Sequence, residues 1–174
     1  ARLAASARRL ALPELDQEDF VASLVDLVRA DAAWVPSGEG ESLYLRPFAF
    51  ASEAFLGVHP AGVVDYYVIA SPAGAYFTHG LEPISIWVTT EYHRAGRGGT
   101  GAAKTGGNYA SSLLPQSLAA DQGCDQVCFL DDVTQRNLEE LGGMNIMVVD
   151  ADGTVRTPRL TGTILEGSTR SAII

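Results

Sequence analysis

The stretch RGGTGAAKTGGNYASSLLPQSLAADQGCDQVCFLDD (97–132) decides the fold. Its first part, 97–108, is rich in glycine and predicts a loop. The segment 109–122 reads as a helix that Gly123 closes, because glycine readily adopts the left-handed conformation found after a helix C-terminus. The apolar run 125–132 then predicts a strand. A loop, a helix and a strand in this order indicate a domain that mixes α and β structure.

The clearest helix signal lies upstream, at 15–33. Asp16 is a good N-cap, and Leu15 and Phe20 are spaced as a hydrophobic staple. Apolar residues then recur at helical spacing along one face. Polar and turn-forming residues from Pro36 onward end this segment.

Strand-like runs lie on both sides of the glycine-rich loop. They cover 42–51, 63–72 and 83–92 before it, and 144–155 and 161–165 after it. The DADG sequence (150–153) predicts a hairpin turn, and a further helix begins near Ser168. The small, turn-rich segment 73–82 is the candidate linker. The sequence therefore predicts an α+β protein with two subdomains.

Both ends of the sequence indicate a piece of a longer protein. Ala1 lies in a segment that reads as the middle of a helix. The helix near Ser168 reaches Ile174 before it presents a complete apolar face. Since a helix gains most of its stability by burying such a face, we expect the chain to continue in the full-length protein.

The composition argues against several classes of partner. The chain has 174 residues, 47% of them hydrophobic, and a net charge of −9. These are the values of a globular protein that repels nucleic-acid backbones and anionic membranes. No apolar run approaches the roughly 20 residues of a membrane span. We therefore expect a small-molecule partner, with no nucleic acid and no membrane.

The cysteines and histidines predict neither a disulfide nor a metal site. Cys124 and Cys128 are the only two cysteines, fewer than a disulfide framework or a structural zinc site requires. The three histidines are scattered without the spacing of metal ligands. Free thiols of this kind fit a reducing cytoplasm.

One lysine, Lys104, stands among eleven arginines, and it lies inside the glycine-rich loop. A lysine whose pKa is lowered acts as a nucleophile and forms Schiff bases, which an arginine cannot do. Neighbouring glycines let the backbone approach a flat ring or an anion closely. From composition alone, an exposed lysine in a flexible loop explains the residue equally well.

The same loop also resembles a nucleotide-binding P-loop. The outer positions of that motif are matched by Gly98, Lys104 and Thr105. Ala103 stands where the motif has glycine. A P-loop joins a strand directly to a helix, and the pair at 106–107 is expected to break any helix that begins at Lys104. The nucleotide-binding reading is therefore the weaker alternative.

Six segments together resemble one known family. They are LYLRPFAFASEAFLGV (43–58), ASPAGAYF (70–77), GGTGAAKTGGNYASSL (98–113), GCDQV (123–127), EELGGMNI (139–146) and TPRLTGTILEGSTR (157–170). The residues in these segments, and the order of the segments along the chain, are similar to those of the class IV, pyridoxal-phosphate-dependent aminotransferases, the branched-chain amino acid aminotransferases in particular. The resemblance implies part of a fold-type IV aminotransferase. The domains implied are the C-terminal part of the small domain (1–74), the interdomain loop (75–82) and the N-terminal part of the large pseudo-barrel domain (83–174).

The resemblance also implies pyridoxal 5′-phosphate as the cofactor. Lys104 would bind it covalently and then move the proton between the substrate Cα and the cofactor C4′. Tyr109 would hydrogen-bond the ring hydroxyl, and Glu140 would face the pyridine nitrogen and keep it protonated. The cofactor phosphate would be held by Arg2, Ser168 and Thr169. Without the resemblance, Glu139 and Glu140 would read as a solvated acidic pair near a turn.

The resemblance assigns the substrate and the reaction as well. Tyr44 and Arg46, two apart on a strand and so on one face, match substrate-recognition residues of the small domain. Val58 would line the apolar side-chain pocket, and Tyr76 belongs to the interdomain loop. The implied reaction transfers the amino group of leucine, isoleucine or valine to 2-oxoglutarate. Amino acids and 2-oxo acids are then the partners of a protein that is a homodimer when full length.

Three residues depart from the family pattern, and one of them, Gly143, occupies a position that some members fill with threonine. Pro115 lies within the helix after the glycine-rich loop, where it should remove a hydrogen bond and kink the helix. Glu166 replaces the usual proline next to the phosphate residues, and its charge weakens phosphate binding unless it points to solvent. Two sibling activities on the same fold, a D-amino-acid aminotransferase and an aminodeoxychorismate lyase, stay open. A degenerate fragment that binds nothing stays open too.

Overall fold

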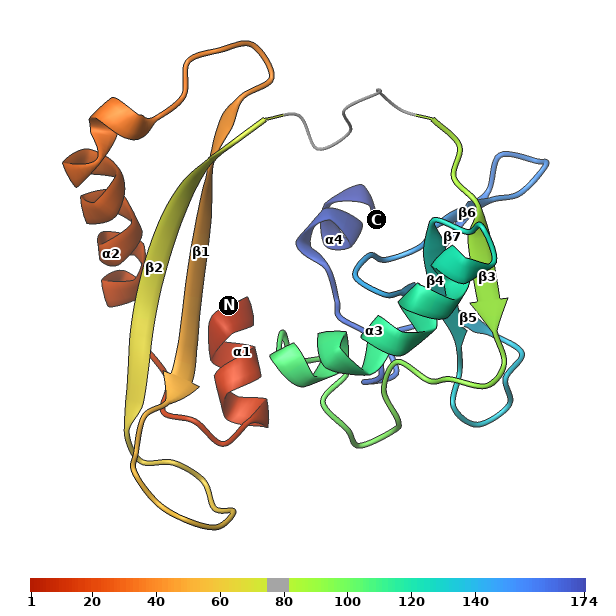
Figure 1. The fold of residues 1–174 in the computed structure, drawn as a ribbon, viewed down its shortest axis with the longest axis horizontal. Helices are drawn as coiled ribbons and strands as arrows, with labels where there is room; N and C mark the ends of the chain where they lie inside the picture. Colours follow the sequence, from red (N-terminus) through yellow and green to blue (C-terminus); the bar gives the residue numbers. More distant parts are fainter. Residues whose placement is uncertain (75–81) are drawn as a thin grey trace. The chain divides into compact units, whose positions relative to one another are not determined.

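The computed structural model describes residues 1–74 and 82–174, and these form two compact units, Ala1–Glu82 and Pro83–Ile174 (Figure 1). Most of the expected interdomain loop, 75–81, lies outside the described residues, and so does the expected substrate residue Tyr76. The assignment of the units to a small and a large domain stays a prediction.

A long antiparallel ribbon forms the centre of the first unit. Strand β1 (Ser42–Ala51) pairs with strand β2 (Val64–Ala73) along ten residues of each. The strands match the expected runs 42–51 and 63–72 to within one residue. Aromatic residues occur in both strands and β-branched residues in β2, and both types favour a pleated, half-buried surface.

Helix α2 (Gln17–Ala30) covers one face of this ribbon (Figure 1). The Asp16 side chain caps it by accepting a hydrogen bond of 2.7 Å from the Glu18 backbone N–H, as expected. Phe20 and Tyr66 meet with ring centroids 6.3 Å apart, and the Ser23 and Tyr66 hydroxyls lie 3.0 Å apart. The shorter helices α1 (Arg2–Arg9) and η1 (Ala32–Trp34) complete the unit.

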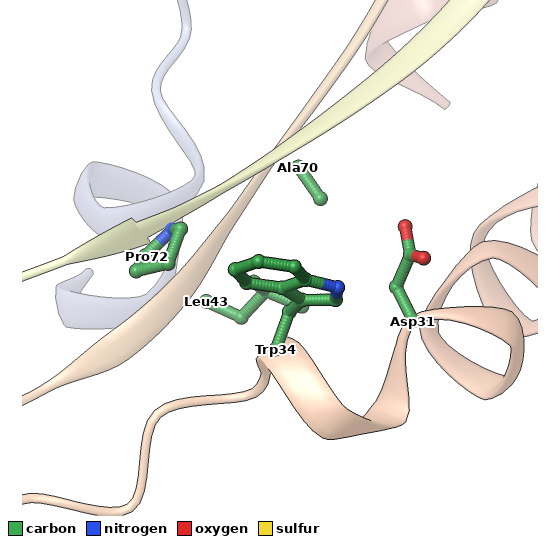
Figure 2. A pocket seen from close by; sticks show the side chains of 5 residues that line it. All are labelled: Asp31, Trp34, Leu43, Ala70 and Pro72. Atoms are coloured by element: carbon green, nitrogen blue, oxygen red, sulfur yellow. The ribbon is translucent and has the colours of Figure 1, made fainter.

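The two faces of the ribbon differ in what they carry. On the helix-covered face, Trp34 lies over Leu43 beside a shallow pocket that is also lined by Asp31, Ala70 and Pro72 (Figure 2). On the other face, Phe48, Phe50 and Tyr67 stack with centroids 5.7–6.3 Å apart. This aromatic stack is continued along β1 by Arg46 and Tyr44, because alternate residues of a strand share a face.

The second unit is built on a three-stranded sheet. Strand β4 (Gln126–Leu130) lies in the middle, parallel to β3 (Ile86–Thr89) and antiparallel to β5 (Leu138–Leu141). Helix α3 (Gly106–Asp121) connects the two parallel strands. Val127 and Phe129 of β4 pack against Ala119 of α3, and all three are fully buried. This small core fixes the position at which α3 begins.

The structure corrects the expected start and course of α3. The helix includes Gly106 and Gly107, with Thr105 as its N-cap, so the expectation that these glycines break a helix is wrong. Glycine in a helix costs about 1 kcal/mol relative to alanine, which weakens the first turn but does not prevent it from forming. Pro115 sits in the middle of α3, fully buried, and the helix continues through it.

The remaining differences concern short elements. The segment 144–155 is not one strand but forms β6 (Val148–Val149) and the start of β7 (Val155–Arg156), with the expected turn at 150–153 between them. The run 161–165 is no strand, and β5 was not expected. Helix α4 (Ser168–Ile173) begins where expected.

The described residues 1–74 and 82–174 contain neither a membrane-spanning helix nor a cluster of metal-binding side chains. None of their helices combines the length and apolar character that a bilayer crossing demands. In the same ranges, no three histidine, cysteine or acidic side chains gather where they could bind a metal ion.

Candidate active site

The glycine-rich loop is held in place by a buried amide, Asn108. Its Nδ2 donates to the carbonyl oxygens of Thr100 and Ala103, at 2.8 and 2.9 Å. Its Oδ1 accepts a hydrogen bond of 2.8 Å from the Thr100 hydroxyl. Asn108 thus uses both amide hydrogens and its oxygen on one turn of the loop. The residue after that turn is Lys104, whose position is therefore set by the first turn of α3.

Lys104 and Tyr109 lie together in the structure. The Lys104 Nζ donates a hydrogen bond to the Tyr109 hydroxyl oxygen. The same Nζ lies 4.5 Å from the centroid of the Tyr109 ring. Lys104 is exposed, whereas Tyr109 is half-buried. An accessible amine therefore stands beside a phenol at the N-terminus of α3.

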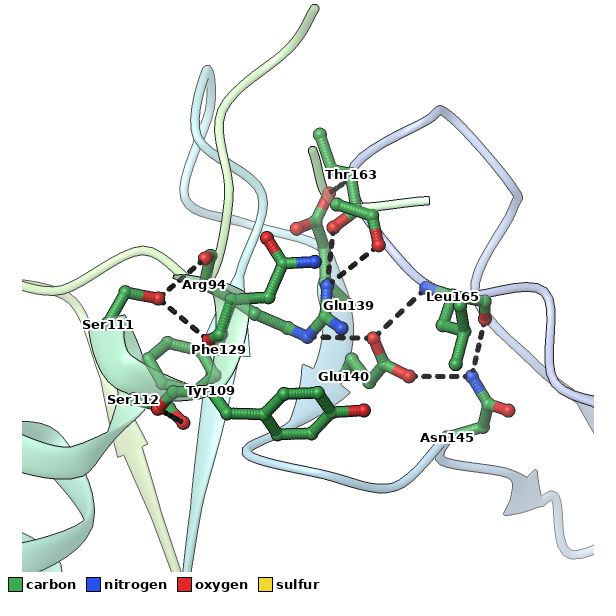
Figure 3. A network of polar contacts seen from close by, with 12 residues as sticks. Arg94, Tyr109, Ser111, Ser112, Phe129, Glu139, Glu140, Asn145, Thr163 and Leu165 are labelled. Carbon is green, nitrogen blue, oxygen red and sulfur yellow. Dashed lines mark hydrogen bonds and ion pairs between the residues drawn. The ribbon is translucent and has the colours of Figure 1, made fainter. Parts of the chain in front are cut away.

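Glu140 is a buried carboxylate, only 3% exposed. Its Oε2 lies 2.9 Å from Arg94 Nε and accepts a hydrogen bond of 3.2 Å from the Leu165 backbone N–H (Figure 3). Its Oε1 accepts a hydrogen bond of 2.9 Å from Asn145 Nδ2. Glu139 is buried as well. The interpretation of this pair as solvated is wrong, because both residues belong to β5.

Opposing effects act on the pKa of Glu140. Burial raises it, because the charged form is disfavoured away from water. The charge of Arg94 opposes this rise, and the Leu165 N–H and the charge of Lys104 act in the same direction as Arg94. The net effect raises the pKa above its ordinary value. Glu140 and Lys104 thus influence each other electrostatically within the second unit.

Arg94 joins three segments that are far apart in sequence. It is 3% exposed, and its Nη1 donates to the carbonyl oxygens of Gly101 and Thr163, at 3.1 and 3.0 Å. Its own carbonyl oxygen accepts a hydrogen bond of 3.1 Å from Ser111 of α3. With the ion pair to Glu140, the guanidinium connects the glycine-rich loop, β5 and the segment before α4.

Gly101 allows this close approach of backbones. A Cβ at this position would lie 2.1 Å from the Thr163 carbonyl oxygen, far inside van der Waals contact. No side chain fits there unless the two segments separate. Glycine at 101 therefore lets one arginine bridge both carbonyls.

Glu139 points to a different set of partners from Glu140, because successive side chains of a strand alternate. It accepts a hydrogen bond of 2.5 Å from the Thr163 hydroxyl. Its Oε2 is buried and has no hydrogen-bond partner among the described residues 1–74 and 82–174. Burial raises the pKa of Glu139, and the nearby charges of Asp132 and Asp131 raise it further. These conditions favour the protonated acid.

The expected phosphate residues Ser168 and Thr169 begin α4 and are exposed. Gly167 precedes them with φ of +74°. A Cβ on Gly167 would fall 1.9 Å from Asn145 Oδ1, so the turn before α4 lies directly against the amide that binds Glu140. Glu166 is also exposed.

The other expected site residues belong to the first unit. Tyr44 and Arg46 line one shallow groove on the β1–β2 ribbon, with the Arg46 guanidinium 5.3 Å from the Tyr44 ring centroid. Arg2 begins α1 and is exposed. Val58 is fully exposed in the loop that connects β1 and β2. The roles of these residues stay predictions.

Sequence reasoning missed three residues of the site: Arg94, Asn108 and Asn145. Arg94 follows a strand-like run and precedes the loop, a place where an arginine is usually exposed. Asn108 carried a weak signal, since asparagine at the start of a helix commonly bonds to backbone groups. Nothing in the local pattern marked Asn145 as the partner of Glu140.

Comparison with known proteins agrees with this geometry. The sequence profile of the family described as amino-transferase class IV matches residues 1–174. A branched-chain-amino-acid aminotransferase of Mycobacterium tuberculosis is 57% identical in an alignment of 178 residues that covers 100% of this chain and 48% of that protein.

Solved structures of the same kind share the fold. The branched-chain aminotransferase of Escherichia coli matches with a TM-score of 0.80 and 32% identity, over 99% of this chain and 55% of that one. The enzyme of Thermobaculum terrenum in its PLP form matches with a TM-score of 0.76 and 26% identity, over 99% and 56%.

The chain therefore belongs to the class IV aminotransferase family. It spans about half the length of the relatives it matches. The expected fold class, an α+β part of a fold-type IV aminotransferase, is confirmed. The P-loop interpretation is wrong, because this family model covers the whole chain and the loop between β3 and α3 is long and anchored by Asn108.

The close approach at Gly101 gives the first prediction. Gly101→Ala should lower the free energy of unfolding of the full-length protein by about 1–3 kcal/mol, because the added methyl forces two backbone segments apart. Urea denaturation measures the change. Gly107→Ala is the matched control, since a Cβ there meets nothing within 4 Å, and it should leave the stability unchanged or slightly higher. Equal stabilities of the two variants would contradict the argument.

The buried Glu139 gives a prediction on pH. Because folding raises the pKa of Glu139, the folded protein binds this proton more tightly than the unfolded chain. That stabilisation is complete below the ordinary pKa of 4.5 and is lost as the pH rises through the raised value. Glu139→Gln, uncharged at every pH, should therefore gain stability relative to the parent as the pH rises from 4.5 towards neutrality.

Urea unfolding of the full-length protein at a series of pH values measures this gain. Glu39→Gln, at an exposed position, serves as the matched control for the loss of one negative charge. A stability difference between Glu139→Gln and the parent that stays constant over this pH range would show that Glu139 does not hold a proton more tightly in the folded state.

Proposed function

We propose that the full-length protein is a pyridoxal-phosphate-dependent aminotransferase of leucine, isoleucine and valine, with 2-oxoglutarate as the amino acceptor. The observation that carries the proposal is the contact between Lys104 and Tyr109, in the same unit as the buried Glu140. The relatives named above are all branched-chain aminotransferases. This favours the branched-chain activity over the sibling activities of the fold.

The described residues fit this cofactor. Its aldehyde requires an amine, which Lys104 presents on an accessible loop, and its ring hydroxyl requires a polar neighbour, which Tyr109 supplies. Glu140 Oε1 accepts one protein hydrogen bond and so keeps a lone pair for a ring N–H. The cofactor, when bound, supplies an electron-poor ring that takes up the electrons of the substrate Cα carbanion.

Lys104 has two tasks in the proposal. Its Nζ holds the cofactor covalently and, once released, takes the proton from the substrate Cα. A general acid–base group must reach its proton within hydrogen-bonding distance, and the loop anchored by Asn108 keeps the amine in one place. Tyr109 accepts a hydrogen bond from the same Nζ and thereby restricts where the amine points.

Glu140 provides the fixed negative charge. A carboxylate beside the ring nitrogen favours its protonated, positively charged form, in which the ring accepts electrons best. Arg94, Asn145 and the Leu165 N–H fix both carboxylate oxygens. The position of the charge is therefore set before any ligand binds.

The remaining assignments follow the resemblance. We propose that the cofactor phosphate is bound by Arg2, Ser168 and Thr169, and that substrate is recognised by Tyr44, Arg46, Val58 and Tyr76. Support comes from the shared groove of Tyr44 and Arg46, which offers a cation beside an aromatic ring. A cation of this kind suits the carboxylates of an amino acid or of glutamate.

We also propose that the full-length protein is a homodimer of the cytoplasm. Leu56 and Val58 are fully exposed on the loop between the ribbon strands. Apolar side chains this exposed are typical of surfaces that another segment or subunit covers.

Replacing Lys104 tests the proposed function. Lys104→Ala in the full-length protein should lower kcat with leucine and 2-oxoglutarate by ~10³-fold or more, since both the covalent link and the proton acceptor are lost. Borohydride reduction of the parent, followed by peptide mass spectrometry, should place the cofactor mass on Lys104. Tyr109→Phe is the control, and it should keep the covalent link and lose about tenfold in kcat at most. Turnover of Lys104→Ala near the parent rate would refute the assignment.

A further inference from the structure

We propose that Arg94 is a positioning residue of this site, which keeps the Glu140 carboxylate ionised and fixed throughout the reaction. The inference rests on the proposed function, because it concerns the charge that Glu140 presents to the cofactor ring. It concerns a residue that no motif in the sequence pointed to.

The contacts of Arg94 are those of a fixed counter-ion. Its side chain is 2% exposed and that of Glu140 is 3% exposed, and Nε lies 2.9 Å from Oε2 (Figure 3). A buried carboxylate without a partner becomes protonated. The cation that lies against Glu140 therefore favours its ionised form.

The shape of the guanidinium matters as much as its charge. Nε lies 2.9 Å from Glu140 Oε2 in an ion pair that is not aligned as a hydrogen bond, while Nη1 donates to the carbonyl oxygens of Gly101 and Thr163. A planar fork makes these contacts at the same time, whereas the ammonium of a lysine is a single point charge. Arg94 thereby ties the orientation of Glu140 to the loop that carries Lys104.

Burial, three charged groups and the Leu165 N–H act on the pKa of Glu140. Arg94 and Lys104 favour its ionised form, and burial and the neighbouring Glu139 oppose it, so the net pKa is raised. Lys104 changes its charge whenever its amine gains or loses a proton, so its support varies during the proposed reaction. Arg94 is permanently charged. Arg94 alone of the two cations therefore supports Glu140 at every stage.

The first test uses the full-length protein without cofactor. The side-chain carboxyl carbon of Glu140, assigned by comparison with Glu140→Gln, is titrated by ¹³C NMR. Arg94→Met should raise the pKa of Glu140 above the parent value, and Arg94→Lys should restore part of the difference. Arg29→Met is the matched control, since it removes an arginine whose side chain is 77% exposed, and it should leave the pKa of Glu140 near that of the parent. An unchanged pKa in Arg94→Met would overturn the proposal.

The second test uses the holoenzyme with ¹⁵N-labelled pyridoxal phosphate. In the parent, the ring nitrogen signal should be that of a protonated pyridine at neutral pH, and in Arg94→Met it should move towards the unprotonated position. The kcat should fall about 10–100-fold, which is the range typical when a residue that orients a metal-binding side chain is removed. The KM should change less. A protonated ring nitrogen in both proteins would contradict the proposal.

Two further comparisons keep the outcomes distinct. In a Glu140→Gln background, adding Arg94→Met should change the ring nitrogen signal no further; an additional shift would show that Arg94 does not act through Glu140. If Arg94→Met does not fold, Arg94→Lys is the deciding variant. A pKa of Glu140 and a kcat in Arg94→Lys that both equal the parent values would show that the guanidinium is not required. A parent protein that binds no pyridoxal phosphate would refute the proposed function, while the titration without cofactor would still judge Arg94.

Discussion

The buried ion pair between Arg94 and Glu140 is the interaction on which the rest of the site depends. Removing two charges from water is costly, and the cost is offset only when geometry and additional hydrogen bonds are good. Here the carboxylate also accepts hydrogen bonds from the Leu165 N–H and the Asn145 side-chain amide, and the guanidinium donates to two carbonyl oxygens. Breaking one partner would leave the other buried and unpaired. The pair therefore constrains every segment that contacts it.

Those segments are the ones that a cofactor site requires. The glycine-rich loop approaches Thr163 so closely that only glycine fits at 101, and Asn108 fixes the remainder of the loop from α3. Asn145 extends the network from Glu140 to the turn at Gly167 before α4. The loop that carries the amine, the carboxylate and the turn before α4 are thus linked through the side chains of Arg94, Asn108 and Asn145. Such linkage holds reactive groups in place without the delay and cost of rearrangement.

The sequence predicted the helices and strands in which apolar residues recur at a regular spacing. The capped helix α2 and the strands β1 and β2 are long enough for their pattern to be read alone. Strand β5 was missed, because its two central glutamates lack any apolar alternation and are buried only through partners elsewhere in the chain. The expected break at the glycines that begin α3 was wrong, since a first helical turn tolerates glycine. Lys104, Tyr109 and Glu140 were predicted by resemblance. Arg94 was not, because its burial depends on contacts with Glu140 and Thr163, far along the chain, that no local pattern records.

In the proposed function, Lys104 binds pyridoxal phosphate, and the cofactor carries amino groups from amino acids to 2-oxo acids and back. The most direct measurement is the absorbance spectrum of the purified full-length protein with pyridoxal phosphate, recorded before and after L-leucine and again after 2-oxoglutarate. We expect a visible absorbance band of the bound cofactor that disappears when leucine is added and returns when 2-oxoglutarate is added. A protein that develops no such band, or a band that leucine leaves unchanged, would contradict it.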